Sequence, residues 1–157
     1  MSEYIAVKLR NLVKQRADKH CEYCRIPEDF SPQAFCFEHI LPKVGGGKTT
    51  KENLAFVCQG CNSFKATRIE VEDEITNEFV KLFNPRQLKW SEHFSWNEDF
   101  TEFIGLTPQG RVTVKALKMN RLGLRNLRRI LYKNGNLPPT EKIREKVLQV
   151  DSNLLTL

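Results

Sequence analysis

Cys21-Glu22-Tyr23-Cys24 and Cys58-Gln59-Gly60-Cys61 are the two stretches that decide how this chain folds. Each C-x-x-C pair places two thiolates on one tight turn, and two such turns complete a tetrahedral zinc site. The 33 residues between the pairs exceed the usual separation in zinc fingers, so we expect them to hold structure of their own. The alternative is a set of unrelated buried cysteines, but two complete pairs among five cysteines favour a structural Zn²⁺. Cys36 is left over, and we expect it to be an ordinary buried thiol.

The segment between the cysteine pairs predicts a strand, a long loop and a second strand. Residues 35–40 are aromatic and β-prone, and residues 54–57 form a second short apolar run. Pro42 and the three glycines at 45–47 mark the flexible connection between them. We expect one helix from near Cys61 toward Ile69, and an N-terminal helix that Ser2 caps and that ends near Lys19.

The second half of the chain predicts a hairpin and several helices. Residues 94–96 and 102–104 flank a turn. Thr107-Pro108 is typical of a helix start, with an N-cap followed by proline, and this helix is expected to stop near Asn120. A second helix is expected over residues 124–134, with Gly135 as its stop and leucines 124, 127 and 131 facing the core. A last short helix is expected to begin at Pro138.

Composition limits the class of protein. A chain of 157 residues with 40% apolar residues fits a single domain, residues 1–157, with one core. Its longest apolar run, residues 54–58, is far shorter than the ~20 residues of a membrane helix, which excludes a spanning protein. The first ten residues mix charges into apolar positions and show no secretory signal, so we expect a cytoplasmic protein with reduced thiols.

The net charge of +6 is distributed unevenly along the chain. Residues 70–102 contain 9 acidic and 3 basic side chains, whereas residues 111–133 contain 8 basic and no acidic side chains. A basic block of this kind is either a nucleic-acid surface or a solvated helix face, and its arginines have the acidic stretch as alternative partners.

A second group of polar residues lies inside and beside the cysteine frame: Glu38-His39, Asn53 and Asn62. Adjacent residues on a strand point to opposite faces, so one of Glu38 and His39 can bind a cation while the other faces a reacting water, provided that the end of the strand bends. Taken singly, His39 is more often a structural histidine and Asn53 a turn residue, so the interpretation depends on their joint spacing. We expect His93, beside several aromatic residues, to be packed in the interior rather than bound to phosphate.

The motif pattern resembles the HNH endonucleases of the ββα-metal (His-Me finger) type. The resemblance rests on Cys21-x2-Cys24, Glu38-His39-Ile40-x-Pro42, Gly45-Gly46, Asn53-Leu54, Cys58-x2-Cys61-Asn62 and Lys65. More weakly, the tail is similar to one HNH subgroup through Leu82-Phe83-Asn84-Pro85-Arg86, Trp90-x2-His93-Phe94 and Gly105-Leu106-Thr107-Pro108-x-Gly110-Arg111. The last histidine of the family pattern is replaced by Asn62, whose amide oxygen can still bind a metal.

The resemblance implies a role for each of these residues. His39 would be the general base for the attacking water, and Asn53 would fix its orientation. Glu38 and Asn62 would bind one catalytic Mg²⁺ or Mn²⁺, and the products would carry 5′-phosphate and 3′-hydroxyl ends. Zinc on Cys21, Cys24, Cys58 and Cys61 would be structural only. The expected DNA contacts are Lys48, Lys51, Lys65, Arg121, Arg125, Arg128 and Arg129.

The sequence therefore predicts an α+β protein. A zinc-stapled ββα-metal motif within residues 1–70 follows an N-terminal helix, and residues 71–157 form a mainly helical extension that is basic at 111–133. The expected function is metal-dependent cleavage of double-stranded DNA by a monomer or a homodimer, without a membrane partner. The alternatives are a non-cleaving, zinc-scaffolded DNA-binding module and a zinc-built interaction domain.

Overall fold

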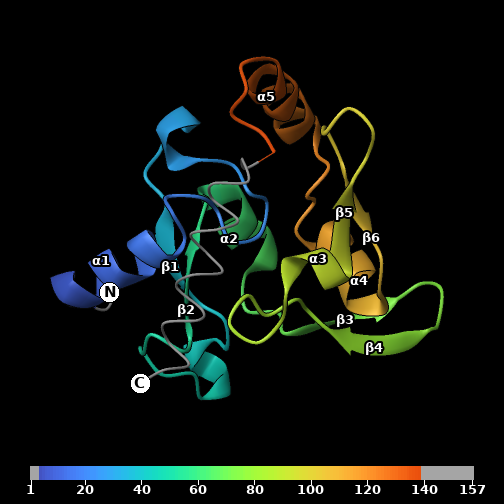
Figure 1. Cartoon of the computed structure of the whole chain (residues 1–157). Helices are drawn as coiled ribbons and strands as arrows, with labels where there is room; N and C mark the ends of the chain where they lie inside the picture. The colour runs from blue at the N-terminus through green and yellow to red at the C-terminus, as the bar shows by residue number, and fades with distance from the viewer. Residues whose placement is uncertain (1–3, 139–157) are drawn as a thin grey trace, which may run out of the picture.

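A computed structural model describes residues 4–138 (Figure 1). It is an α+β fold in which short helices alternate with three separate two-stranded antiparallel sheets. The 3-10 helices are η1 (Glu28–Phe30) and η2 (Lys43–Gly45). The remaining elements, in chain order, are α1 (Val7–Arg16), β1 (Cys36–His39), β2 (Leu54–Val57), α2 (Gln59–Lys65), β3 (Glu70–Asp73), β4 (Glu78–Lys81), α3 (Trp90–His93), β5 (Phe94–Trp96), β6 (Phe103–Gly105), α4 (Pro108–Ala116) and α5 (Leu122–Lys133).

The first sheet and the helix after it form the expected ββα unit. β1 pairs antiparallel with β2, with His39 opposite Leu54 and Glu38 opposite Ala55. All four residues of β2 are buried, which explains why that strand is uniformly apolar. α2 begins at Gln59 and ends at Lys65, earlier than expected at both ends, and it packs against β1.

The free edge of β2 is covered by the first cysteine pair. The Glu22 N–H donates to Phe56 O at 2.9 Å, and the Phe56 N–H donates to Glu22 Oε2 at 2.8 Å. This pairing holds the Cys21–Cys24 turn beside the end of β2, where Cys58 follows directly. Arg86 of the extension completes the contact with an ion pair to the Glu22 carboxylate.

α1 is shorter than the helix expected from the sequence. It begins after Ala6, which provides no capping side chain, and Ser2 lies outside the described residues. It ends at Arg16 because Asp18 and Lys19 adopt left-handed backbone angles, with φ of 49° and 57°. The helix packs against β2 through buried Val13.

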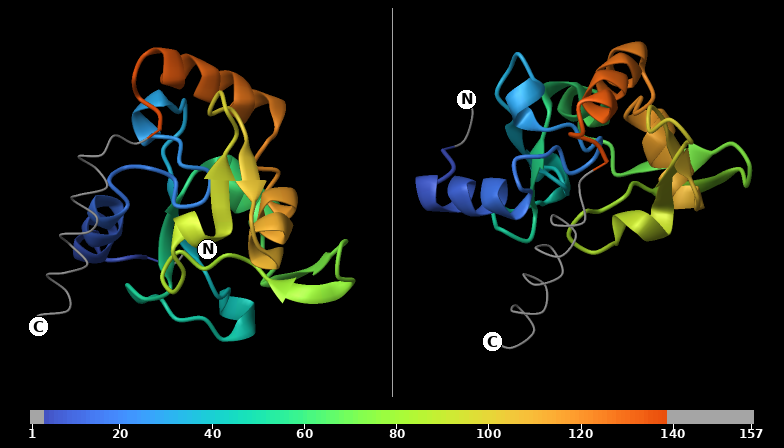
Figure 2. Two further views of the ribbon diagram at one scale, coloured as in Figure 1. Left: turned by 45° about the vertical axis from the view of Figure 1, so that its right-hand side comes forward. Right: turned by 45° about the horizontal axis from the view of Figure 1, so that its top comes forward.

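The extension contains two hairpins as well as helices. The hairpin of β5 and β6 confirms the expected turn, whereas the hairpin of β3 and β4 was not expected. Val71 and Val80 lie opposite each other in that hairpin and are half-buried, while Glu70 and Glu72 are exposed. In Figures 1 and 2 this hairpin projects from the extension, with α4 packed beside it.

The two longer helices of the extension follow the local sequence signals. Thr107 caps α4 by accepting a hydrogen bond from the Gly110 N–H at 3.1 Å. α4 ends at Ala116 rather than near Asn120, and α5 ends before Gly135, which has a φ of +76°. The expected inward leucines of α5 are confirmed: Leu124 and Leu131 are buried and Leu127 is half-buried. The helix expected from Pro138 onward lies outside the described residues.

Buried apolar side chains from both halves join in one cluster, from Val13 to Leu137. The ββα unit and the extension therefore share a core. Within residues 4–138, no helix is long and apolar enough to cross a membrane.

Candidate active site

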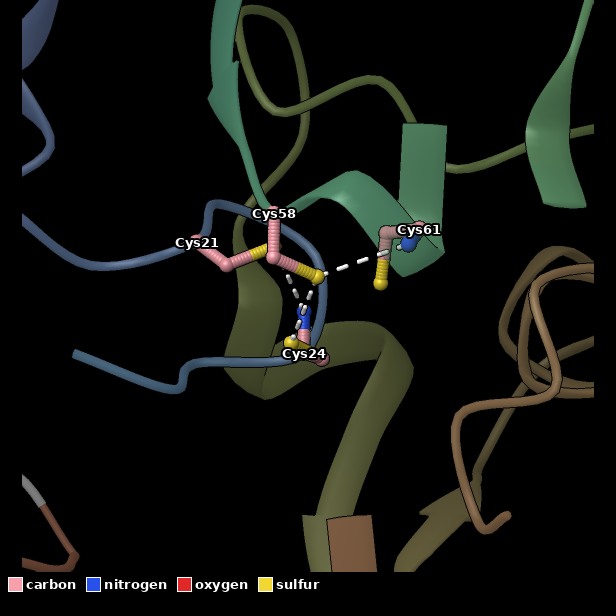
Figure 3. A group of neighbouring side chains, drawn as sticks. All are labelled: Cys21, Cys24, Cys58 and Cys61. Carbon is pink, nitrogen blue, oxygen red and sulfur yellow. Dashed lines mark hydrogen bonds between the residues drawn. The ribbon is translucent and has the colours of Figure 1, made fainter. Parts of the chain in front are cut away.

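The four paired cysteines meet at one buried point, although they come from two distant segments. Their sulfur atoms all lie within 4.8 Å of one another, and Figure 3 shows the side chains of both turns directed toward the same place. The Cys24 N–H donates to Cys21 Sγ and the Cys61 N–H donates to Cys58 Sγ, each at 3.4 Å. These N–H···S bonds stabilise negative charge on sulfur, as a thiolate ligand requires.

The chemistry of this donor set fits a zinc ion. Burial raises the pKa of Cys21, whereas hydrogen bonds from the neighbouring cysteines lower the pKa of Cys58. The pKa values of these two cysteines are thus shifted in opposite directions. A divalent cation stabilises all four cysteines as thiolates at once. With four sulfur ligands, tetrahedral zinc has no open position for a substrate, so such a site is structural.

Two arginines expected to contact DNA, Arg121 and Arg128, lie against the cysteine turns. Arg128 is fully buried, and its guanidinium donates to Cys24 O at 3.3 Å and to Thr101 O at 3.0 Å. Arg121 Nη2 lies 3.9 Å from Cys58 Sγ, and its guanidinium lies over the Phe64 ring. The expectation that Arg128 contacts DNA is wrong, because a buried guanidinium with backbone partners cannot reach a phosphate. Since zinc with four thiolates carries a net charge of −2, both arginines are placed to balance it.

The remaining expected DNA contacts differ in their exposure. Arg125 forms an ion pair with Glu102 at 3.3 Å, so it has a partner from the acidic stretch. Arg129 is exposed and bonds to Asn126 at 3.1 Å. Lys48 and Lys51 are exposed on the loop that connects β1 and β2. The arginines of α5 therefore do not form one continuous phosphate-binding face.

His39 lies at the end of β1, half-exposed, on the face opposite to Glu38. Its Nε2 atom lies 2.8 Å from the hydroxyl of Thr49 in the long loop. Burial, together with the positive charge of Lys65, lowers the pKa of His39, so the imidazole is neutral at pH 7. Thr49 carried no sequence signal, because a threonine in a polar loop is unremarkable until the fold places it against His39.

Glu38 is directed into the interior, where Lys65 and Tyr23 meet it. Lys65 Nζ lies 2.5 Å from Glu38 Oε1, and the Tyr23 hydroxyl donates to Oε2 at 3.5 Å. The side chains of Lys65 and Glu38 are only 2% and 5% exposed. The expectation that Lys65 contacts DNA is therefore wrong, because its ammonium is enclosed as the counter-charge of Glu38.

Asn53, at the end of the long loop, binds both the start of the loop and Lys48 in its middle. Its Oδ1 accepts from the Leu41 N–H at 2.8 Å, and its Nδ2 donates to Leu41 O and Lys48 O, each at 2.9 Å. The Ile40 N–H donates to Asn53 O at 2.9 Å, so both residues that follow His39 are bound to Asn53. The loop packs so closely that a Cβ at Gly47 would overlap the carbonyl oxygen of Leu41.

Asn62 lies in the middle of α2, directly after Cys61, and is half-buried. It shares a helix face with Lys65, three residues later, because residues three apart are neighbours on a helix. The ion pair between Lys65 and Glu38 brings this face against β1. Within the described part of the chain, no direct hydrogen bond joins the Asn62 side chain to Glu38.

His93, the histidine of the extension, is packed in the interior and is not part of the site. His93 is buried, its ring lies against Phe83, and its Nδ1 is 2.6 Å from the Thr107 hydroxyl. Its backbone carbonyl approaches Gly110 so closely that a Cβ there would overlap it. The Gly105-to-Arg111 motif is thereby explained by packing: Thr107 caps α4 and contacts His93, and Arg111 forms an ion pair with Asp73.

Comparison with known proteins agrees with this geometry. The family model described as HNH endonuclease matches residues 21–68, the segment that holds both cysteine pairs and the β1–β2–α2 unit. A CRISPR-associated endonuclease Cas9 from Corynebacterium diphtheriae is 44% identical over 52 residues. That match covers 32% of this chain and 5% of the relative, and no solved structure matches the chain. Residues 21–68 of this chain therefore match the HNH endonuclease family, and the rest of the chain lies outside that match.

Proposed function

We propose that the protein is a metal-dependent endonuclease that hydrolyses DNA phosphodiester bonds, leaving 5′-phosphate and 3′-hydroxyl ends. The observation that carries this proposal is the position of His39. It is a neutral, half-exposed imidazole at the end of β1, held by Thr49, with the carboxylate of Glu38 on the opposite face of the same strand.

His39 is the proposed general base. In the tautomer whose Nε2–H donates to the Thr49 hydroxyl, 2.8 Å away, the lone pair of Nδ1 would accept the proton of the attacking water. The lowered pKa of His39 keeps this lone pair available below neutral pH. Asn53 supports this geometry, because it binds the backbone of both residues that follow His39.

Glu38 and Asn62 are the proposed ligands of one Mg²⁺ or Mn²⁺, because carboxylate and amide oxygens are the donors that hard cations prefer. The ammonium of Lys65 already occupies the Glu38 carboxylate, so a metal there would take the place of an existing positive charge. When bound, such a cation stabilises the negative charge that develops on the phosphate and on the leaving 3′ oxygen. Lys65 must then share Glu38 with the metal or withdraw from it.

The DNA is expected to lie across the long loop, where Lys48 and Lys51 flank Thr49. Phosphate contacts at these lysines would position the scissile bond near His39 without taking part in the chemistry. We further propose one nuclease domain in which the extension supports the metal turns through Arg121 and Arg128. A reducing, cytoplasmic location suits the free thiols.

One observation favours the alternative of a DNA-binding module that does not cleave. Glu38 is already neutralised inside the protein by Lys65, and a permanent ion pair there would exclude a catalytic cation. The two functions differ in what they do to supercoiled plasmid.

Plasmid cleavage in the presence of Mg²⁺, of Mn²⁺ or of no added divalent cation tests the proposal, with zinc content measured in parallel. The wild-type protein should nick or linearise the plasmid only with added cation. His39→Ala should lower the rate by ~10²–10⁴-fold while zinc, fold and DNA affinity persist. Binding without cleavage under all three conditions would instead establish the binding module, and cleavage by His39→Ala at the wild-type rate would refute the role of His39.

A further inference from the structure

Arg16, the last residue of α1, contacts the loop that carries the proposed site. Its Nη1 donates to Lys51 O and its Nη2 donates to Leu54 O, both at 2.7 Å. These are short hydrogen bonds from a charged donor, the strong class for proteins. Arg16 lies before the segment that matches the HNH family, residues 21–68.

The two carbonyls that Arg16 binds are those at the base of the loop. His39 and Leu54 are directly opposite in the β1–β2 ladder, and the next pair is bonded through the Ile40 N–H and Asn53 O. Because bonded and non-bonded pairs alternate in an antiparallel ladder, the Leu54 carbonyl points away from β1. Arg16 binds this outward-facing carbonyl. Its second hydrogen bond is to Lys51 O, which lies on the other side of Asn53 along the chain.

Asn53 connects the segment that Arg16 binds to the end of β1, where His39 lies. Its backbone lies between the two residues that Arg16 binds, and its side chain and carbonyl bind Leu41 and Ile40. Hydrogen bonds from Arg16 to Lys51 O and Leu54 O, the short backbone segment between those residues, and the hydrogen bonds of Asn53 thus connect α1 to the two residues after His39.

We propose that Arg16 is a positioning residue of the nuclease, which holds Asn53 and the base of the loop so that His39 and Thr49 keep their catalytic geometry. This inference rests on the proposed function. It assigns α1 a role in positioning the site, although that helix lies outside residues 21–68, the segment that matches the HNH family.

The forked guanidinium is needed because two carbonyls must be bound at once. Arginine presents several N–H donors in one rigid plane, whereas a lysine ammonium on a flexible stem is a single point. Arg16→Lys should therefore hold one carbonyl at most and restore only part of the function. Arg10, exposed on the same helix, provides the matched control, because Arg10→Ala removes the same side chain away from the loop.

The test combines kinetics with amide hydrogen exchange on the full-length, zinc-loaded protein. Arg16→Ala should lower kcat on saturating plasmid by about 10²-fold, the cost of a misplaced reacting group, and leave DNA affinity and zinc content unchanged. The amide protons of Ile40 and Leu41 should exchange about tenfold faster, since both bond to Asn53. Arg10→Ala should behave as wild type in both measurements.

The proposed action of Arg16 through Asn53 can also be tested by comparing the kcat values of single and double mutants. If Arg16 works by holding Asn53, then Arg16→Ala combined with Asn53→Ala should lower kcat little more than Asn53→Ala alone. Fully additive effects on kcat would overturn the proposed connection. So would an Arg16→Ala protein with wild-type kcat, or with wild-type exchange at Ile40 and Leu41.

Two further outcomes are distinguishable. If Arg16→Ala does not fold, Arg16→Lys is judged by the same kcat and exchange criteria. If the wild-type protein cleaves no DNA, the proposed function fails, and the exchange rates alone then decide whether Arg16 holds the loop.

Discussion

Replacing Lys65 with methionine leaves the Glu38 carboxylate buried without its counter-charge. The two side chains are 2% and 5% exposed, and their charged atoms lie 2.5 Å apart. Methionine keeps an unbranched stem of similar length, so the change removes the charge with little loss of packing. The neighbouring hydroxyl of Tyr23, 3.5 Å from Glu38 Oε2, is too weak a donor to replace the ammonium.

The expected cost is large because the pair is buried. Removing one partner of a buried ion pair costs about 3–5 kcal/mol, a large part of the 5–15 kcal/mol that stabilises a typical domain. A cation bound at Glu38 would offset part of this loss. At a concentration of 100 times its Kd, it would restore about 2.7 kcal/mol. Lys65→Met should therefore be more strongly stabilised by Mn²⁺ than the wild type is.

The loss should also depend on pH. Burial raises the pKa of Glu38, and Lys65 opposes that rise, so the variant carboxyl should have a pKa higher still. A carboxyl whose pKa is raised in the folded state destabilises the fold only above the pKa that the same carboxyl has in the unfolded chain, because folding must then bury a charge. The difference between wild type and Lys65→Met should thus be smallest near pH 4 and grow toward pH 7.

Urea unfolding across this pH range, in buffers freed of Mg²⁺ and Mn²⁺ but with zinc retained, measures the effect. Lys115→Met is the control, because Lys115 pairs with Glu74 on the surface and exposed pairs contribute about 0–1 kcal/mol. The free energy of unfolding of Lys65→Met could lie within about 1 kcal/mol of the wild-type value at pH 7, or the difference between the two could be independent of pH. Either result would mean that the buried pair is not what stabilises this site.

Three other changes test separate parts of the molecule. Cys58→Ser should release the bound metal and unfold the ββα unit, because zinc binding and folding are coupled; a folded variant without zinc, seen by metal analysis and circular dichroism, would contradict this. Changing Lys48 and Lys51 together to glutamine should weaken binding to unrelated duplexes and reduce the salt slope by about 0.9 for each phosphate that the variant no longer neutralises; an unchanged slope would place the DNA elsewhere. Asp73→Asn should lower stability at neutral pH, because hydrogen bonds from Arg111 lower the pKa of Asp73 to about 2 and a carboxyl with a depressed pKa stabilises the fold above its unfolded-state pKa; a thermal melt of the variant at pH 7 that equals that of the wild type would refute the linkage.

Local chemistry in the sequence was sufficient for much of the fold. The two C-x-x-C pairs specify their own tight turns, and Thr107-Pro108 specifies a helix start through one side-chain oxygen and one fixed φ. The limits of β2 are those expected from the sequence, because its apolar run begins after the polar Asn53 and reaches the second cysteine pair at Cys58. Each of these signals depends on atoms only a few residues apart, so the sequence contains the whole interaction.

Only the tertiary structure decided what the charged side chains do. The sequence shows eight basic residues in 111–133, but not that Arg128 is buried against Cys24, 104 residues away, or that Lys65 is enclosed with Glu38. The same applies to Arg16, whose partners lie 35 and 38 residues away. A lysine or an arginine is the same residue in solvent, in an ion pair and at a phosphate; its role is set by desolvation and by the partner within about 4 Å, and both arise only when distant segments pack together.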